Sequence, residues 1–213
     1  MLKWRIKMEL ILASKSPRRR EILSRLGMVF RTEASLVNED NLLELNNDKS
    51  VEERVKILSC SKVDYVASKY QNQEVMVLGA DTVVVMKEQL FGKPQTDAHA
   101  RKMISMLSGT THQVITAVTV SVPSLCDKET ALARTDVTFR SLTAPEIDWY
   151  VNHASYTDKA GGYGIQDEGA LLVESISGCY YNVVGLPISL TLKLLGRFNH
   201  SFLDFQHRPS IKL

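Results

Sequence analysis

Three arginines follow a helix-start signal near the N-terminus, and this spacing could bind an anion. Ser16 is a favourable N-cap residue and Pro17 suits the first helical position. A helix N-terminus already carries partial positive charge, so Arg18, Arg19 and Arg20 are unfavourable there unless an anion docks between them. We interpret the segment as a phosphate-binding turn, and the alternative is a solvated basic first turn.

Two carboxylates could supply acid–base or metal chemistry. Asp81 directly follows an apolar strand pattern, where an ionised carboxylate is costly unless it is paired or binds a metal. Because the strand pattern continues from Thr82, a turn aspartate is less natural than a functional one. Glu39, in a polar stretch, offers a second carboxylate, and Mg²⁺ is usually held by such groups beside substrate phosphates.

Three lysines and a glutamine could complete a site for a phosphorylated ligand. Lys93 lies between a glycine and a proline in an expected tight loop, and Lys62 lies on or beside the apolar face of an expected helix. Lys159 and Gln166 bound a glycine-rich stretch whose backbone can approach a ligand closely. Each feature alone is also typical of a solvated lysine or a flexible loop.

The composition excludes several classes of protein. The chain has 213 residues, of which 44% are hydrophobic and 23% charged, and its net charge of +2 does not indicate a nucleic-acid or membrane surface. No apolar run approaches the ~20 residues that span a bilayer, and no signal-peptide pattern follows the start. Three widely spaced cysteines without a C-x-x-C motif favour a reducing compartment, so we expect a cytoplasmic protein.

Strand and helix patterns alternate in the first half of the chain, and the second half is richer in strands. The first half predicts strands at 9–13 and 75–86, helices at 17–26, 51–70 and 97–107, and a polar loop at 38–50. The second half predicts strands at 113–122, 131–140 and 170–175, helices at 144–153 and 187–195, and a glycine-rich loop at 156–166. These patterns predict one α/β domain over 9–195 and a tail at 197–213 of unknown structure.

Six short motifs occur in one order along nearly the whole chain. They are Ser14-x-Ser16-Pro17-Arg18-Arg19, Gly79-Ala80-Asp81-Thr82-Val83-Val84, Gly92-Lys93-Pro94, Leu107-Ser108-Gly109, Lys159-Ala160-Gly161-Gly162-Tyr163-Gly164-Ile165-Gln166 and Tyr181-Asn182-Val183-Val184-Gly185-Leu186-Pro187. Together they closely resemble the Maf-like nucleoside triphosphate pyrophosphatases, in the branch that prefers dTTP and UTP. Six motifs in register make a coincidence implausible.

This resemblance implies both a fold and an activity. The implied fold is α/β, like that of inosine triphosphate pyrophosphatases, with a mixed, elongated sheet flanked by helices and a cleft between two lobes. The implied reaction is hydrolysis of a nucleoside triphosphate to the monophosphate and pyrophosphate, with a divalent metal cation, Mg²⁺ or Mn²⁺.

The resemblance also implies roles for individual residues. Asp81 resembles the catalytic base, Lys62 and Lys93 resemble catalytic residues, and Glu39 with Asp81 resembles the metal site. The implied substrate-binding residues are Ser14, Arg18, Arg19, Thr82, Lys159 and Gln166, of which Arg18, Thr82 and Gln166 match the positions that choose the base. Asp167 stands where the family usually has glycine, so we expect a carboxylate beside the base pocket.

Three alternatives stay open at this point: a nucleotide-binding regulator of cell division without turnover, the same reaction on another base, and a nucleic-acid-binding module. Asp81, Lys62 and Lys93 favour an enzyme, because binding alone needs no general base. The near-neutral charge disfavours nucleic acid. The expected partner is a nucleoside triphosphate, without nucleic acid or membrane, and a homodimer is left open.

Overall fold

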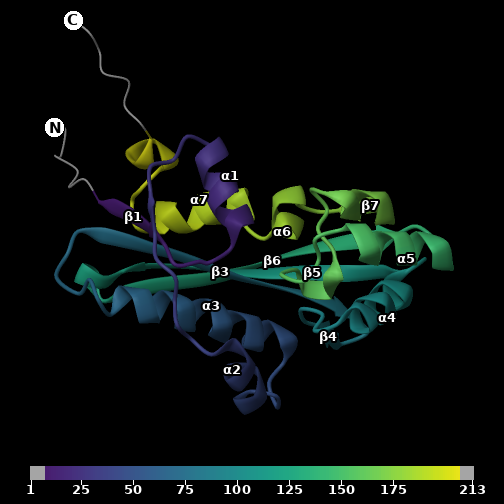
Figure 1. Cartoon of the computed structure of the whole chain (residues 1–213). Helices are drawn as coiled ribbons and strands as arrows, with labels where there is room; N and C mark the ends of the chain where they lie inside the picture. The colour runs from purple at the N-terminus through teal and green to yellow at the C-terminus, as the bar shows by residue number, and fades with distance from the viewer. Residues whose placement is uncertain (1–7, 207–213) are drawn as a thin grey trace, which may run out of the picture.

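A mixed β-sheet runs through the molecule (Figure 1). The computed structural model describes residues 8–206, in which seven strands take the order β2-β1-β3-β5-β6-β7, with β4 paired to β3. β1 is parallel to β2 and β3, and the other pairs are antiparallel. The strands are β1 Glu9–Leu12, β2 Arg31–Thr32, β3 Val75–Met86, β4 Gln89–Phe91, β5 Thr111–Val122, β6 Asp127–Phe139 and β7 Val173–Ser177.

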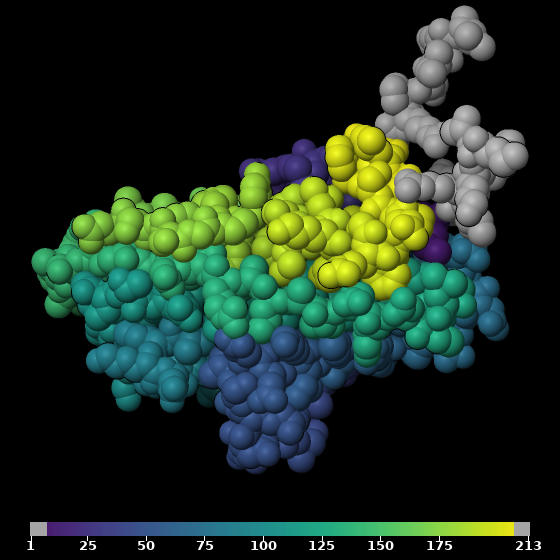
Figure 2. Space-filling model, turned by 180° about the vertical axis from the view of Figure 1, so that it is seen from behind, coloured from purple at the N-terminus to yellow at the C-terminus, as the bar shows by residue number. Residues whose placement is uncertain are grey.

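Helices flank this sheet on both faces, as the α/β prediction requires. One face carries α1 Pro17–Arg25, α6 Tyr180–Val184 and α7 Ile188–Arg197, and the other carries α2 Glu39–Leu45 and α3 Val51–Ala67 (Figure 1). α4 Asp97–Leu107 and α5 Ala144–His153 pack together near the β4 and β7 end. From behind, the blue segment that holds α2 and α3 projects below the green strands (Figure 2). The predicted fold class is therefore confirmed.

Most of the longer helices begin at a side-chain cap, at the position where the sequence predicted the helix to begin. Ser16 and Thr96 accept hydrogen bonds from the N3 backbone N–H of α1 and α4. Capping boxes start α3 at Ser50 and α5 at Thr143, and each orders two backbone N–H groups that would otherwise lack partners.

Two local predictions were wrong. The stretch 38–50 is not all loop, because α2 begins after the N-cap Asn38, whose side chain accepts from the N–H of Asn41. The strand predicted at 170–175 starts later: Glu168–Leu172 forms a 3-10 turn and only then does β7 begin.

β3 is the buried centre of the sheet, as predicted. Leu78 and Ala80 pack on the α1 and α7 side, whereas Val77 packs on the α3 side. Gly79 lies against α3, and a Cβ there would come within 2.5 Å of Val63, so no larger residue fits without movement. Packing on both faces explains the continuous apolar sequence of this strand.

The middle of β3 has a strand neighbour on one side only among the described residues. Pairing with β1 ends where Leu78 lies opposite Leu12, and pairing with β4 begins at Val84. On its other edge β3 pairs with β5 without interruption. Because side chains alternate along a strand, this gap lets residues from both faces of the sheet meet at one opening.

The described part of the tail returns to the core. The 3-10 turn Phe202–Phe205 buries Phe205 in the same apolar cluster as α1 and α7, and Gln206 bridges to Met28. Residues 207–213 lie outside the described residues, and the division into a domain at 9–195 and a tail stays a prediction. No helix within residues 8–206 is long and apolar enough to cross a membrane.

Candidate active site

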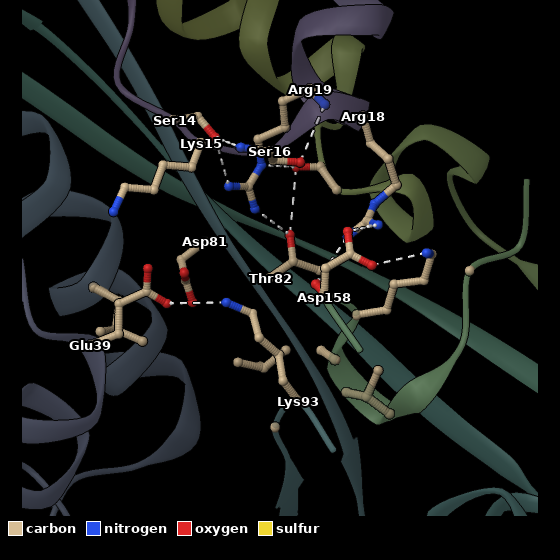
Figure 3. A pocket seen from close by; sticks show the side chains of 18 of the residues that line it. Ser14, Lys15, Ser16, Arg18, Arg19, Glu39, Asp81, Thr82, Lys93 and Asp158 are labelled. Atoms are coloured by element: carbon tan, nitrogen blue, oxygen red, sulfur yellow. Dashed lines mark hydrogen bonds and ion pairs between the residues drawn. The ribbon is translucent and has the colours of Figure 1, made fainter. Parts of the chain in front are cut away.

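A cleft of about 790 Å³ opens at the gap in the middle of β3. Its walls come from the start of α1, from α2 and α3, from the loop at 92–94, and from the glycine-rich loop (Figure 3). The structure brings every predicted site residue to this lining, namely Ser14, Arg18, Arg19, Glu39, Lys62, Asp81, Thr82, Lys93, Lys159 and Gln166. Segments far apart in the sequence therefore form one site.

Asp81 forms the centre of an acid–lysine cluster on the α3 side of the cleft. It lies inside β3, whose bounds match the strand predicted at 75–86, and the pairing of β3 with β1 has ended before it. Lys62 donates to Asp81 Oδ1 and lies 2.9 Å from Glu39 Oε1. The side chains of Lys62 and Asp81 are each 9% exposed, so this lysine does not extend into solvent.

Glu39 joins this cluster from α2. Burial alone would raise the pKa of Glu39, but the positive charges of Lys62, Lys93 and Arg19 lower it overall below the usual range. Lys93 is largely exposed, and its Nζ lies 3.9 Å from Glu39 Oε2. Glu39 therefore stays ionised at neutral pH, and the exposed Lys93 ammonium is accessible to a ligand in the cleft.

The two carboxylates fit a divalent cation that also binds substrate. Lys62 contacts Oδ1 of Asp81 and Oε1 of Glu39, so the second oxygen of each carboxylate lies outside those contacts. Mg²⁺ typically takes one or two protein carboxylates and completes its shell with water and phosphate oxygens. Within residues 8–206 no group of three or more histidine, cysteine or acidic side chains is placed to hold a metal without a substrate.

Arg19 projects from α1 into the cleft and is held by neutral groups. Its Nε donates to the carbonyl of Gly185 at 2.8 Å and its Nη2 to Thr82 Oγ1 at 3.0 Å, while Nη1 lies 3.4 Å from Ser14 Oγ (Figure 3). Burial lowers the pKa of Arg19, although an arginine remains charged. Within the described residues it forms no direct ion pair, although the charges of Asp81 and Glu39 act on it from a distance, so an anion entering the cleft would supply a direct counter-charge.

Arg18 is held differently, by an acidic residue that sequence reasoning gave no role. Its Nη1 donates to Asp158 Oδ2 at 2.7 Å. The ammonium of Lys159 lies 2.9 Å from the other oxygen of Asp158 and donates to the carbonyl of Ser155. Burial opposes ionisation of Asp158, but Lys159 and Arg18 lower its pKa overall. The only sequence signal for Asp158 was its place beside Lys159.

Arg20 does not line the cleft and is exposed. Successive residues point about 100° apart on a helix, so three consecutive arginines cannot all face one ligand. The prediction that an anion docks between all three arginines is therefore wrong for Arg20.

The glycine-rich loop is anchored to the core by two tyrosines. Tyr150 donates to the carbonyl of Gly162 at 3.1 Å, and the hydroxyl of Tyr163 lies 2.8 Å from His112 Nε2. Gln166 at the end of this loop lines the cleft, whereas Asp167 is exposed and lies outside the lining. The carboxylate of Asp167, which we expected beside the base pocket, therefore lies outside the cleft lining.

The molecule is an α/β protein in which one cleft places an acid–lysine cluster opposite an arginine that has no carboxylate partner within residues 8–206. The family model described as Maf-like protein matches residues 9–198. This chain belongs to the Maf-like family.

Curated relatives cover almost the whole chain. A protein of Bacillus pumilus named dTTP/UTP pyrophosphatase is 43% identical over 190 residues, which are 89% of this chain and 96% of the relative. A protein of Moorella thermoacetica with the same name is 44% identical over 89% of this chain and 95% of its own. A third, from Bacillus thuringiensis subsp. konkukian, is 43% identical over 93% of this chain and 98% of its own.

Proposed function

We propose that this chain hydrolyses nucleoside triphosphates to the monophosphate and pyrophosphate, with a preference for dTTP and UTP. The observation that carries the proposal is one cleft that holds both the Asp81–Lys62 pair and Arg19, which has no carboxylate partner in the part of the chain that the structure describes. The first arrangement is suited to activating water, and the second to binding a phosphate. The names of the relatives support the choice of base.

The side chains of the cleft divide the reaction between them. Arg19 and the N-terminus of α1 bind phosphate oxygens. Lys62 fixes Asp81 through Oδ1, so Oδ2 can accept a proton from water. The water oxygen bonds to the α-phosphorus, the bond to the bridging oxygen of pyrophosphate breaks, and the proton goes to Asp81. General-base catalysis of this kind contributes about 10²–10⁴-fold.

Mg²⁺ or Mn²⁺ completes the proposal. Asp81 and Glu39 would hold the cation, which when bound neutralises charge on phosphate oxygens. Lys93 would add its charge from the loop at 92–94, since its exposed side chain lines the same cleft.

The base is assigned to the wall formed by the glycine-rich loop. Gln166 carries both a donor and an acceptor, which suits the carbonyl and imide edge of uracil and thymine. Arg18, fixed by Asp158, adds donors at the same wall. A polar group matched to one base edge is left unpaired by another base, and this penalty creates preference.

A pyrophosphate-release screen tests the proposal. Wild-type protein is assayed with dTTP, UTP, CTP, GTP and ATP in Mg²⁺ or Mn²⁺, with a chelator control. We expect pyrophosphate as the first product and the highest kcat/KM for dTTP and UTP. Tight nucleotide binding by calorimetry without product would instead identify a regulator, and tight binding of RNA would identify a nucleic-acid-binding module.

We also assign the protein to the cytoplasm. Cys60, Cys126 and Cys179 are all free thiols, which suits a reducing compartment. A homodimer stays a prediction.

A further inference from the structure

A chain of hydrogen bonds leads from Arg19 into the core of the protein. Arg19 Nη2 donates to Thr82 Oγ1 at 3.0 Å, the hydroxyls of Thr82 and Thr116 are 2.9 Å apart, and Thr116 Oγ1 donates to the carbonyl of Asn182 at 3.2 Å. With the Thr116 proton on the Asn182 carbonyl, which can only accept, Thr116 accepts from Thr82 at 2.9 Å; the other acceptor within reach of the Thr82 hydroxyl, the Gly185 carbonyl, is farther away at 3.5 Å. Every link then has a defined direction, and the chain ends on the backbone of α6.

The side chain of Asn182 fixes the helix on which this chain ends. Asn182 is fully buried, and its Nδ2 donates to the carbonyl of Val114 at 2.9 Å and to Thr135 Oγ1 at 3.0 Å. These contacts tie α6 to β5 and β6. A helix of five residues has little stability of its own, so its position depends on such contacts.

α6 also supplies the second acceptor for Arg19. The helix ends at Gly185, whose φ of 115° is accessible to glycine but strained for other residues. This turn aims the Gly185 carbonyl at Arg19 Nε, at 2.8 Å. Both strong contacts of the Arg19 guanidinium therefore depend on where α6 lies.

We propose that Asn182 is a positioning residue for Arg19, acting through Gly185 on one side and through Thr116 and Thr82 on the other. The proposal rests on the proposed function, in which Arg19 binds a phosphate of the substrate. Arg19 has no carboxylate partner in the described part of the chain to orient it, so neutral acceptors on two separate elements must do so. Loss of either acceptor lets the guanidinium rotate out of the geometry in which it binds an anion.

The Thr116 hydroxyl gives the sharpest test, because the same strand contains a matched control. Thr116 and Thr119 are both fully buried on β5, and their spacing places them on opposite faces of the sheet. Thr119 bonds to the hydroxyls of Ser59 and Thr130, none of which lines the cleft. Thr116→Val and Thr119→Val therefore remove the same group at the same burial, and only the first breaks the chain to Arg19.

The experiment is a double-mutant cycle with Arg19→Met, read by kcat/KM and by the affinity for inorganic pyrophosphate. We expect Thr116→Val to weaken both by roughly tenfold in the Arg19 background and by less than about twofold beside Arg19→Met. Thr116→Ser, which keeps the hydroxyl, should restore most of the loss, and Thr119→Val should change neither value.

Equal losses in both Arg19 backgrounds, or equal losses from Thr116→Val and Thr119→Val, would overturn the inference and leave Asn182 a packing residue. The same cycle is run with Asn182→Ala. If Thr116→Val folds poorly, this second variant still tests the inference. If wild-type protein releases no pyrophosphate from any nucleotide, the proposed function fails. The pyrophosphate-affinity cycle then decides the positioning role by itself.

Discussion

Two of the buried cations that line the cleft, Lys62 and Arg19, are held in opposite ways. Lys62 reaches in from α3 and contacts two carboxylates, Asp81 and Glu39. Arg19 reaches in from α1, and its guanidinium bonds to one carbonyl and two hydroxyls of the described residues. Both side chains are largely buried, so the difference lies in their partners and not in their exposure.

We expect this difference to separate two tasks within one cleft. A lysine that is already neutralised cannot attract a substrate anion strongly, but it can hold a carboxylate in one orientation. Among the described residues Arg19 is buried without an ion pair to offset its desolvation, so an incoming phosphate should bind most favourably there. We therefore expect substitutions on the two sides to differ in kind.

The largest effect should come from removing the charge of Asp81. Asp81→Asn keeps the shape of the side chain but can neither accept a proton from water effectively nor act as a charged metal ligand. We expect kcat for pyrophosphate release to fall by at least about 100-fold, with nucleotide affinity little changed and the protein still folded, since Glu39 remains as a carboxylate partner of Lys62. A variant that keeps more than about a tenth of wild-type kcat would show that Asp81 is not the base.

The stabilities of Lys62→Met and Arg19→Met should differ in the absence of ligand. Lys62→Met leaves buried Asp81 without its cation, which should lower the free energy of unfolding by about 3 kcal/mol. Arg19→Met removes an unpaired buried charge along with its hydrogen bonds, and these effects offset each other to within about 1 kcal/mol.

Urea unfolding in phosphate-free buffer measures both changes. Added pyrophosphate should stabilise the wild type but not Arg19→Met, because binding to the folded state alone raises stability. Equal destabilisation by the two variants would remove the distinction between the two cations.

His112 is another buried basic side chain, and unlike Lys62 and Arg19 it is uncharged in the folded protein at neutral pH. Burial lowers its pKa from 6.5 to about 4, and Nε2 contacts Tyr163. Between these values the unfolded chain binds a proton that the folded protein does not, so stability falls as the pH falls through this window. From pH 7 to pH 5 the loss from this group is about 2 kcal/mol.

His112→Gln should remove this part of the acid sensitivity. The measured quantity is the difference in unfolding free energy between pH 7 and pH 5, compared between wild type and variant, because acidic groups elsewhere contribute to both. An unchanged difference would mean that His112 titrates normally in the folded protein.

The parts of the fold that depend on local signals were predictable from the sequence. Capping residues and apolar periodicity located the long helices, and the continuous apolar run identified β3 as the centre of the sheet. α2 was missed because none of its residues is buried, so it shows no apolar period. Its cap Asn38 and the acidic residues of its first turn were the available signal.

The contacts within the site could not be read from the sequence. Residue types indicated that Asp81, Lys62 and Arg19 could take part in catalysis or phosphate binding, but the residues that they contact lie far away in the sequence. Arg18 and Asp158 are 140 positions apart, and Arg19 and Gly185 are 166 apart. Such pairings follow from how β1, β3 and α6 meet, and no local pattern encodes that arrangement.

The smallest effect on activity is expected at the neighbours Gln166 and Asp167, at the end of the glycine-rich loop to which we assign the base. Asp167 is exposed, outside the cleft lining, and holds its turn through backbone bonds to Gly164 and Ala170. An exposed charge is screened by water and salt, so Asp167→Gly should leave the ratio of kcat/KM for dTTP and CTP within about twofold of wild type.

Gln166→Ala is the matched variant, because it removes the neighbouring side chain that does line the cleft. Without the amide, a pyrimidine imide edge loses a partner, and the dTTP to CTP ratio should fall by roughly tenfold, equivalent to about one neutral hydrogen bond. Both ratios are measured under one set of metal and salt conditions. A shift with Asp167→Gly but not with Gln166→Ala would place the base on the outer side of the loop, and the assignment of the base wall would then be wrong while the division between Lys62 and Arg19 would stand.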